Sequence, residues 1–186
     1  DSFGTGNTVN DVVGWKESEH PNDNAQDVIA KESSNTASFS DYKSPDGGRF
    51  VKLLGDNDEW VCRQINATGY ENLSLKYYWR GEASAEADDF GVVELRPNGT
   101  SDSSCNSNEN GAWTTLASHA LDNASGESNQ TQEAWALNTV NLPADSDGLF
   151  LIRFRNHSSA DTEYFRVDGV SVEGSLIPTD VCENMD

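Results

Sequence analysis

The side chains that could carry catalysis are numerous but scattered along the chain. Histidines occur at His20, His119 and His157, and Asp and Glu account for 32 of the 186 residues. No two histidines have the spacing of a metal-binding pair, and no Gly-x-Ser-x-Gly sequence surrounds a serine. We interpret each histidine as a solvated loop residue. Among the many carboxylates, nothing in the sequence singles out two as the acid and base of a glycosidase. The sequence therefore predicts a protein that is not an enzyme and has no catalytic residues.

Three cysteines, Cys62, Cys105 and Cys182, are few for a disulfide framework and odd in number. Cys62 lies in an apolar run typical of a strand, which predicts a buried free thiol. Cys105 and Cys182 lie in polar, loop-like segments. We expect these two to form a disulfide, which would tie the C-terminal tail to the rest of the domain.

Six asparagines fit the Asn-x-Ser/Thr acceptor pattern of N-glycosylation, and most fall in expected loops or at strand ends. The chain opens at Asp1 rather than at a methionine, which is typical of a processed start. These features predict an exported, glycosylated protein outside the cell or on its surface. The acceptor asparagines are Asn66, Asn72, Asn98, Asn123, Asn129 and Asn156.

Aromatic side chains offer a third kind of chemistry, because sugars stack their apolar C–H faces on exposed Trp or Tyr. Tyr78 lies on the face of an expected strand opposite its apolar residues. Trp113 and Trp135 each open an expected strand beside a loop. Each can also be a core residue. These three side chains are the predicted stacking residues of a glycan site.

The charge balance excludes several partners. Twelve basic and 32 acidic residues give a net charge of −20. Such a chain lacks the cationic clusters that bind nucleic acid or anionic membranes. No stretch approaches the roughly 20 apolar residues of a membrane helix. Basic residues gather in the expected strands and acidic residues in loops and termini, which favours either charge balance within the sheets or head-to-tail contact between copies.

The elements that position these residues are strands. Apolar residues come in short, partly alternating runs bounded by Gly, Asn, Asp, Ser and Pro, and helical periodicity is nearly absent. Leu73, Leu75, Tyr77 and Trp79 share one strand face, and Phe150, Ile152 and Phe154 share another. The pattern predicts an all-β, antiparallel β-sandwich of jelly-roll type with about ten strands. We expect residues 1–174 to form the sandwich and residues 175–186 to form an extended C-terminal tail.

Several of these runs also carry a family resemblance. Gly69-Tyr70-Glu71-Asn72-Leu73-Ser74-Leu75-Lys76-Tyr77 and Phe165-Arg166-Val167-Asp168-Gly169-Val170-Ser171-Val172 are two of them. Residues 48–174 resemble bacterial extracellular sandwich modules related to MAM domains and to jelly-roll carbohydrate-binding modules. The resemblance implies a structural calcium held by Asp168 and the N-terminal segment, although Gly4 stands where such modules often carry an acidic residue. No other cofactor is expected.

Two functions follow from these patterns. The first is a non-catalytic structural or adhesive module outside the cell, a glycosylated subunit of a surface fibre that assembles through terminal strands and complementary charge. The alternative is a carbohydrate-binding module that recognises glycans on a sheet face or its loops through Tyr78, Trp113 and Trp135. The expected partners are therefore other copies of the chain or a glycan, and neither nucleic acid nor a membrane.

Overall fold

The computed structural model describes the part of the chain that forms the sandwich. The described residues are 15–18, 28–32, 49–55, 58–81, 85–97, 105, 113–121, 135–144, 146, 148–160 and 163–178. None of them belongs to a helix with the length and apolar character needed to cross a bilayer.

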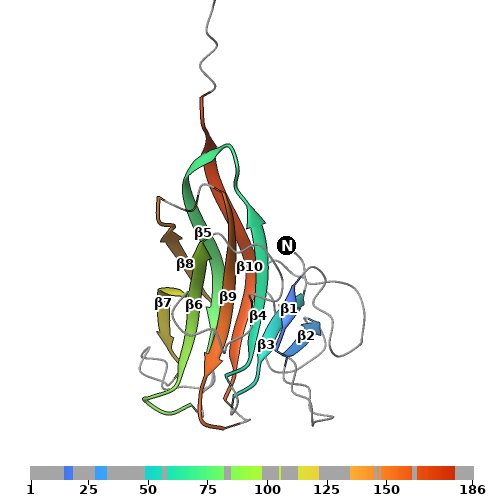
Figure 1. Cartoon of the computed structure of the whole chain (residues 1–186). Coiled ribbons are helices and arrows are strands. Elements are labelled where there is room, and N and C mark those ends of the chain that lie inside the picture. The colour runs from blue at the N-terminus through green and yellow to red at the C-terminus, as the bar shows by residue number, and fades with distance from the viewer. Residues whose placement is uncertain are drawn as a thin grey trace, which may run out of the picture.

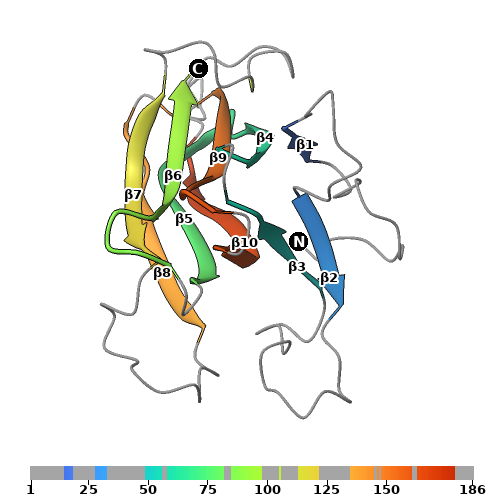
Figure 2. The same ribbon diagram turned by 90° about the horizontal axis from the view of Figure 1, so that it is seen from below.

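The described strands form two antiparallel sheets, which pack face to face (Figures 1 and 2). Sheet A has the order β1 (Lys16–Glu17), β4 (Trp60–Asn66), β9 (Leu149–His157), β6 (Phe90–Pro97) and β7 (Thr114–Ala120). Sheet B has the order β2 (Val28–Glu32), β3 (Arg49–Leu53), β10 (Phe165–Leu176), β5 (Tyr70–Arg80) and β8 (Ala136–Asn141). The predicted all-β antiparallel sandwich is confirmed, and its jelly-roll connectivity stays a prediction.

The core lies between the sheets and follows the alternation of the strands. Leu73, Leu75 and Tyr77 of β5 are buried in it, and Trp79 packs against it. From sheet A, Phe150, Ile152 and Phe154 of β9 face them. Because successive strand residues point to opposite faces, every second residue of each strand must be apolar to fill this layer. The sequence satisfies that requirement in both strands.

A disulfide covers part of the outer face of sheet A. Cys62 is bonded to Cys105, and both are buried beside Trp60 and Leu151. The predicted Cys105–Cys182 bridge and the predicted free thiol at Cys62 are therefore wrong. Alternation places Cys62 correctly in a strand, but it cannot show which loop residue reaches the outer face of that strand. Cys182 lies outside the described residues.

An ion pair is buried on the same outer face. Glu94 of β6 lies directly opposite Arg153 of β9, and Arg153 Nη2 is 2.7 Å from Glu94 Oε2. The two side chains are only 4% and 7% exposed. Trp113 stacks over the guanidinium group with its ring centroid 4.1 Å from the central carbon. Burial lowers the pKa of Arg153, and the charge of Glu94 opposes that shift. This pair is an instance of charge balance within a sheet.

β10 is longer than the sequence predicts. It runs to Leu176, where it pairs with Tyr70 of β5, and the backbone N–H of Ile177 donates to the carbonyl of Gly69. The expected boundary after Gly174 therefore falls inside the strand. The rest of the expected tail, from residue 179 onward, lies outside the described residues.

Candidate functional site

The structure separates the three predicted stacking residues. Tyr78 is half-buried on the outer face of sheet B, where Asp168 and Leu137 are its direct neighbours on the two adjacent strands. Trp135 precedes β8 of the same sheet, and its ring lies edge-on to that of Phe50 at 5.4 Å. These contacts restrict both rings.

Trp113 lies apart from the other two, beside sheet A. It precedes β7 and stacks over the Arg153 guanidinium group. One flat platform made of all three predicted rings is therefore not present.

Asp168, the predicted calcium ligand, is fully buried in β10. It lies just before a break in the register between β10 and β5, where Gly169 has a φ of +56°. Among the described residues, no three His, Cys, Asp or Glu side chains are grouped closely enough to hold a metal ion. The calcium at Asp168 stays a prediction.

The predicted glycan acceptors fall into three groups. Asn66 and Asn72 are exposed at the end of the sandwich where β4 passes into β5. Asn156 is fully buried, and its side-chain amide donates to the backbone carbonyls of Leu53 and Glu163. Glycosylation of all three stays a prediction, and burial of its amide sets Asn156 apart from the other two. The remaining acceptors lie outside the described residues: Asn98, Asn123 and Asn129.

A polar cluster between the sheets corrects the interpretation of His119. Its imidazole stacks on Trp79 at 4.2 Å, and its Nε2 is 2.7 Å from the Tyr77 hydroxyl. Asn138 donates to the same hydroxyl oxygen over 2.6 Å, so the hydroxyl proton is directed at Nε2 of a neutral imidazole. His119 thus lies in β7 and links the two sheets, rather than lying in a solvated loop.

Burial keeps both titratable groups of this cluster neutral. It lowers the pKa of His119 to about 4. It raises the pKa of Tyr77 to about 12, against the smaller opposing effect of the Asn138 hydrogen bond. Near pH 7, therefore, neither group is poised to exchange a proton. Of the other histidines, His157 is exposed at the end of β9 and contacts Asp58, and His20 lies outside the described residues.

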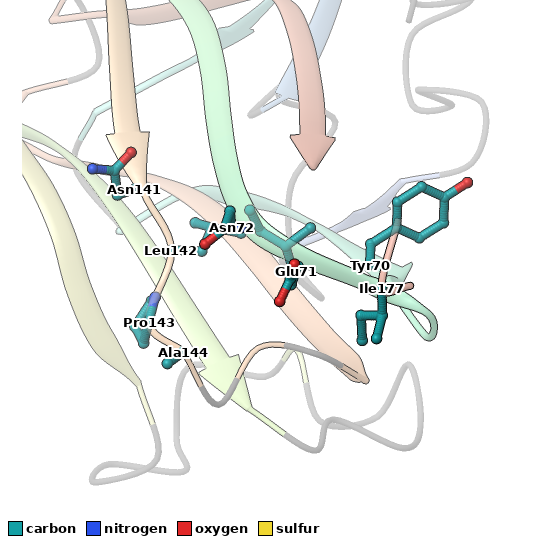
Figure 3. Close-up of a pocket in the computed structure, with 9 residues that line it drawn as sticks. Tyr70, Glu71, Asn72, Asn141, Leu142, Pro143, Ala144 and Ile177 are labelled. Carbon is teal, nitrogen blue, oxygen red and sulfur yellow. The ribbon is translucent and has the colours of Figure 1, made fainter. Parts of the chain in front are cut away.

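The described surface has a pocket at the end of β5 and β8 opposite to the Tyr77–His119 cluster. A pocket of about 500 Å³ opens where β5 begins and where β8 and β10 end (Figure 3). β5 contributes Tyr70, Glu71, Asn72 and Leu73. The end of β8 and the residues after it contribute Asn141, Leu142, Pro143 and Ala144, and Ile177 follows β10. We call these nine residues the end pocket.

Local backbone chemistry shapes the end pocket. Ala67–Tyr70 form a tight turn in which the N–H of Tyr70 donates to the carbonyl of Ala67. Gly69 has a φ of +85° at the third position, as a type II turn requires. Asn66 strengthens this turn, because its Oδ1 accepts the N–H of Thr68.

A β-bulge follows the turn directly. The register shifts so that Asn72 and Leu73 lie opposite the single residue Gly174 of β10. Asn72 takes a left-handed backbone conformation, with a φ of +54°, which asparagine tolerates better than most residues. Bulges of this kind change the direction in which side chains point. A Cβ at Gly174 would lie 2.5 Å from the end of the Leu73 side chain, so glycine lets the two strands approach without displacing it.

The lining of the end pocket combines apolar and polar groups. Tyr70 and Ile177 are 42% and 43% exposed, and Leu73, Leu142 and Pro143 add further apolar surface. Glu71 supplies a carboxylate, which accepts from hydroxyls, and Asn72 and Asn141 supply amides, which can both donate to and accept from them. No lysine or arginine lines the end pocket. The volume lies within the range of about 300–1,000 Å³ of small-ligand sites.

Sequence reasoning did not find the end pocket. Tyr70, Glu71 and Asn72 belong to a strand motif in the sequence, and Asn72 is also a predicted glycan acceptor. One signal was present: an aromatic residue directly follows the turn sequence Asn66-Ala67-Thr68-Gly69, where a strand start is exposed. Asn141 gave no such signal, because only the pairing of β8 with β5 brings the end of β8, with Asn141 opposite Ser74, to the start of β5.

Similarity to known proteins appears at the level of structure. No family model and no curated protein sequence matches the chain. The K2 cleaved adhesin domain of Lys-gingipain matches with a TM-score of 0.60 and 17% identity, covering 92% of this chain and 95% of that one. TmCBM61, in complex with β-1,4-galactotriose, matches with a TM-score of 0.54 and 10% identity, covering 87% and 88%.

An enzyme shares the same fold. The Stig cyclase Fisc from Fischerella sp. TAU matches with a TM-score of 0.54 and 13% identity, covering 90% of this chain and 89% of that one. Likeness at these identities shows the fold alone, a β-sandwich also found in adhesin domains and carbohydrate-binding modules. The relation to MAM domains stays a prediction. Function has to be argued from the site.

Proposed function

We propose that this protein is a non-catalytic adhesive module outside the cell that binds a neutral glycan in the end pocket. The observation that carries the proposal is the pocket itself, in which exposed Tyr70 lies with a carboxylate and two amides in a volume of about 500 Å³. A sugar ring needs this combination, because it presents apolar C–H faces and hydroxyl edges together.

The charge of the chain selects the kind of glycan. Glu71 is the one charged residue that lines the end pocket, and the chain carries a net charge of −20. Anionic sugars would be repelled by both the pocket and the whole protein. Neutral sugars lose nothing to this field, and their hydroxyls can donate to the Glu71 carboxylate. We therefore expect neutral hexoses or pentoses as ligands.

The setting outside the cell has independent support. The Cys62–Cys105 disulfide is of the kind that forms and persists in oxidising compartments.

The strand order supports a jelly roll, because β3, β4, β5 and β6 alternate between sheets B and A, and β7 to β10 alternate in the same way. Adhesin domains and TmCBM61 share the sandwich, which is consistent with the proposal.

The test is binding to an array of neutral oligosaccharides, followed by calorimetry with the strongest ligand. We expect Tyr70→Ala and Asn141→Ala to weaken binding at least tenfold, because each removes a contact from the end pocket. Tyr78→Ala is the matched control, since it removes an aromatic ring from the outer face of sheet B. Loss of binding in Tyr78→Ala, with both pocket variants unaffected, would place the ligand on the sheet face and overturn the proposal.

Assembly into a fibre is a second candidate function. Leu176, at the end of β10, is 69% exposed, and Ile177 beside it is 43% exposed. Apolar residues on a strand end can enter a neighbouring subunit by strand addition. Light scattering on the full chain and on variants lacking residues 1–11 or 176–186 tests this. Large oligomers that disappear in either truncation would support assembly through terminal strands, and oligomers that persist in both would exclude it.

A further inference from the structure

The three acceptor asparagines in the described residues differ in the state of the atom that would carry the sugar. N-glycosylation uses the side-chain nitrogen Nδ2, which must give up one of its two protons. The surroundings of that nitrogen therefore decide whether the folded protein can hold a glycan there.

At Asn156 both Nδ2 protons are committed. Nδ2 lies 2.8 Å from the carbonyl of Glu163 and 3.1 Å from the carbonyl of Leu53. The residue is fully buried, and its two bonds join β9 of sheet A to β3 and to the segment before β10 of sheet B. A sugar on this nitrogen would break at least one bond and would have no room between the sheets.

Asn66 is an exposed residue whose side-chain oxygen accepts a hydrogen bond. The residue is exposed, and only its Oδ1 is used, as the acceptor of the Thr68 N–H at 3.0 Å. Thr68 is also the third residue of the acceptor sequence. This turn therefore holds the Asn66 amide and the Thr68 hydroxyl group on one short loop. The Asn66 Nδ2 takes no part in the hydrogen bond from the Thr68 N–H.

Asn72 is exposed on the bulge of β5. Its side chain lines the end pocket between Glu71 and Leu142 (Figure 3). The left-handed backbone at this position turns the residue out of the regular strand, so the amide is accessible although the acceptor sequence lies within a strand.

We propose that Asn66 and Asn72 accept N-linked glycans, that Asn156 does not, and that the glycan on Asn72 closes the end pocket. In each transfer, Nδ2 attacks the anomeric carbon of a sugar carried on a lipid pyrophosphate. The new C–N bond forms as the C–O bond to the pyrophosphate breaks, and Nδ2 loses one proton to a base of the transferase. The first sugar on Asn72 then lies at the pocket mouth, where a soluble glycan would otherwise bind.

Closure of the end pocket by the Asn72 glycan rests on the proposed function. The glycans on Asn66 and Asn72, and the lack of one on Asn156, do not. If the end pocket binds a glycan, modification of Asn72 makes it a switch, since an attached sugar and a soluble one cannot share the space. If the end pocket binds nothing, the pattern of modification still follows from the three amide environments.

Three single substitutions test the pattern without changing any asparagine. Thr68→Ala, Ser74→Ala and Ser158→Ala each destroy one acceptor sequence. The full chain is secreted from a eukaryotic host, and its folded fraction is studied by intact mass and glycopeptide mapping. We expect the mass of one glycan to be lost in Thr68→Ala and in Ser74→Ala, and no change in Ser158→Ala. A glycan on Asn156, or none on both Asn66 and Asn72, would overturn the pattern.

The same preparations test closure of the end pocket. Ser74→Ala keeps the Asn72 side chain and lacks its glycan, so it is matched to the wild type. We expect Ser74→Ala to bind the array of neutral oligosaccharides at least tenfold more tightly than the glycosylated wild type. Equal binding by both would refute closure. If neither Ser74→Ala nor the unglycosylated protein binds any oligosaccharide on the array, the proposed function is refuted instead. The glycopeptide map would still show which asparagines carry a glycan.

Discussion

Replacing His119 with glutamine should make the protein's stability less sensitive to acid. In the folded chain the imidazole accepts a hydrogen bond from Tyr77 and stacks on Trp79, and burial lowers its pKa from 6.5 to about 4. Between these two pH values the unfolded chain binds a proton that the folded chain does not. Lowering the pH therefore favours unfolding, and stability is lost as the pH falls through this window. Glutamine can still accept from Tyr77 but does not titrate.

The size of the effect follows from proton linkage. With a folded pKa of about 4 and an unfolded pKa of 6.5, the group destabilises the fold by roughly 2 kcal/mol more at pH 5 than at pH 7. His119 is partly exposed, so water weakens the interaction. We expect the wild type to lose about 1–2 kcal/mol more than His119→Gln between these two pH values.

The assay is urea unfolding of both proteins at pH 7, 6 and 5, which keeps the samples above the isoelectric point near 4.2. The two proteins share all other titrating groups, so the difference between their stability curves isolates His119. The absolute stability of His119→Gln is not decisive, because the variant also loses ring stacking. Parallel curves across this range would refute the claim that His119 is a buried neutral link between the sheets.

Three further variants test the packing. Replacing Cys62 and Cys105 together with serine opens a link between residues 43 positions apart and should cost about 4 kcal/mol in the free energy of unfolding, measured in urea; equal stability with and without reductant would contradict the bridge. Arg153→Met removes the closer cation from the buried Glu94 carboxylate, which keeps Arg155 at 3.4 Å, and should cost about 1–3 kcal/mol, and a neutral result would argue against the ion pair. Gly91→Ala would place a Cβ 2.4 Å from a core aromatic ring and should cost about 1–3 kcal/mol, whereas Gly148→Ala has open space and serves as the control.

The fold could be predicted because its main determinant is local. Alternation along β5 and β9 is visible in the sequence, and each observed strand lies close to an apolar run bounded by turn residues. The extension of β10 to Leu176 could not be predicted in this way. Residues 174–176 have no apolar alternation and join the sheet through backbone pairing with the start of β5.

The site depends on contacts between distant segments, which alternation does not encode. The end of β8 meets the start of β5 because these strands pair, with Asn141 opposite Ser74, and Cys62 meets Cys105 because a loop residue reaches the outer face of β4. Asn156 has the acceptor sequence of an exposed residue, yet it faces the interior between Leu53 and Glu163. In each case the sequence shows the residue type and the structure supplies its neighbours.

The central claim is that the end pocket binds a neutral glycan. Its most direct test is an NMR titration of unglycosylated protein, labelled with ¹⁵N, with the strongest oligosaccharide from the array. Binding in the end pocket predicts saturable shifts of the backbone amides of residues 70–73, 141, 142 and 144, with those around Tyr78 unchanged. Shifts confined to the outer face of sheet B, or no shifts with any oligosaccharide on the array, would contradict the claim.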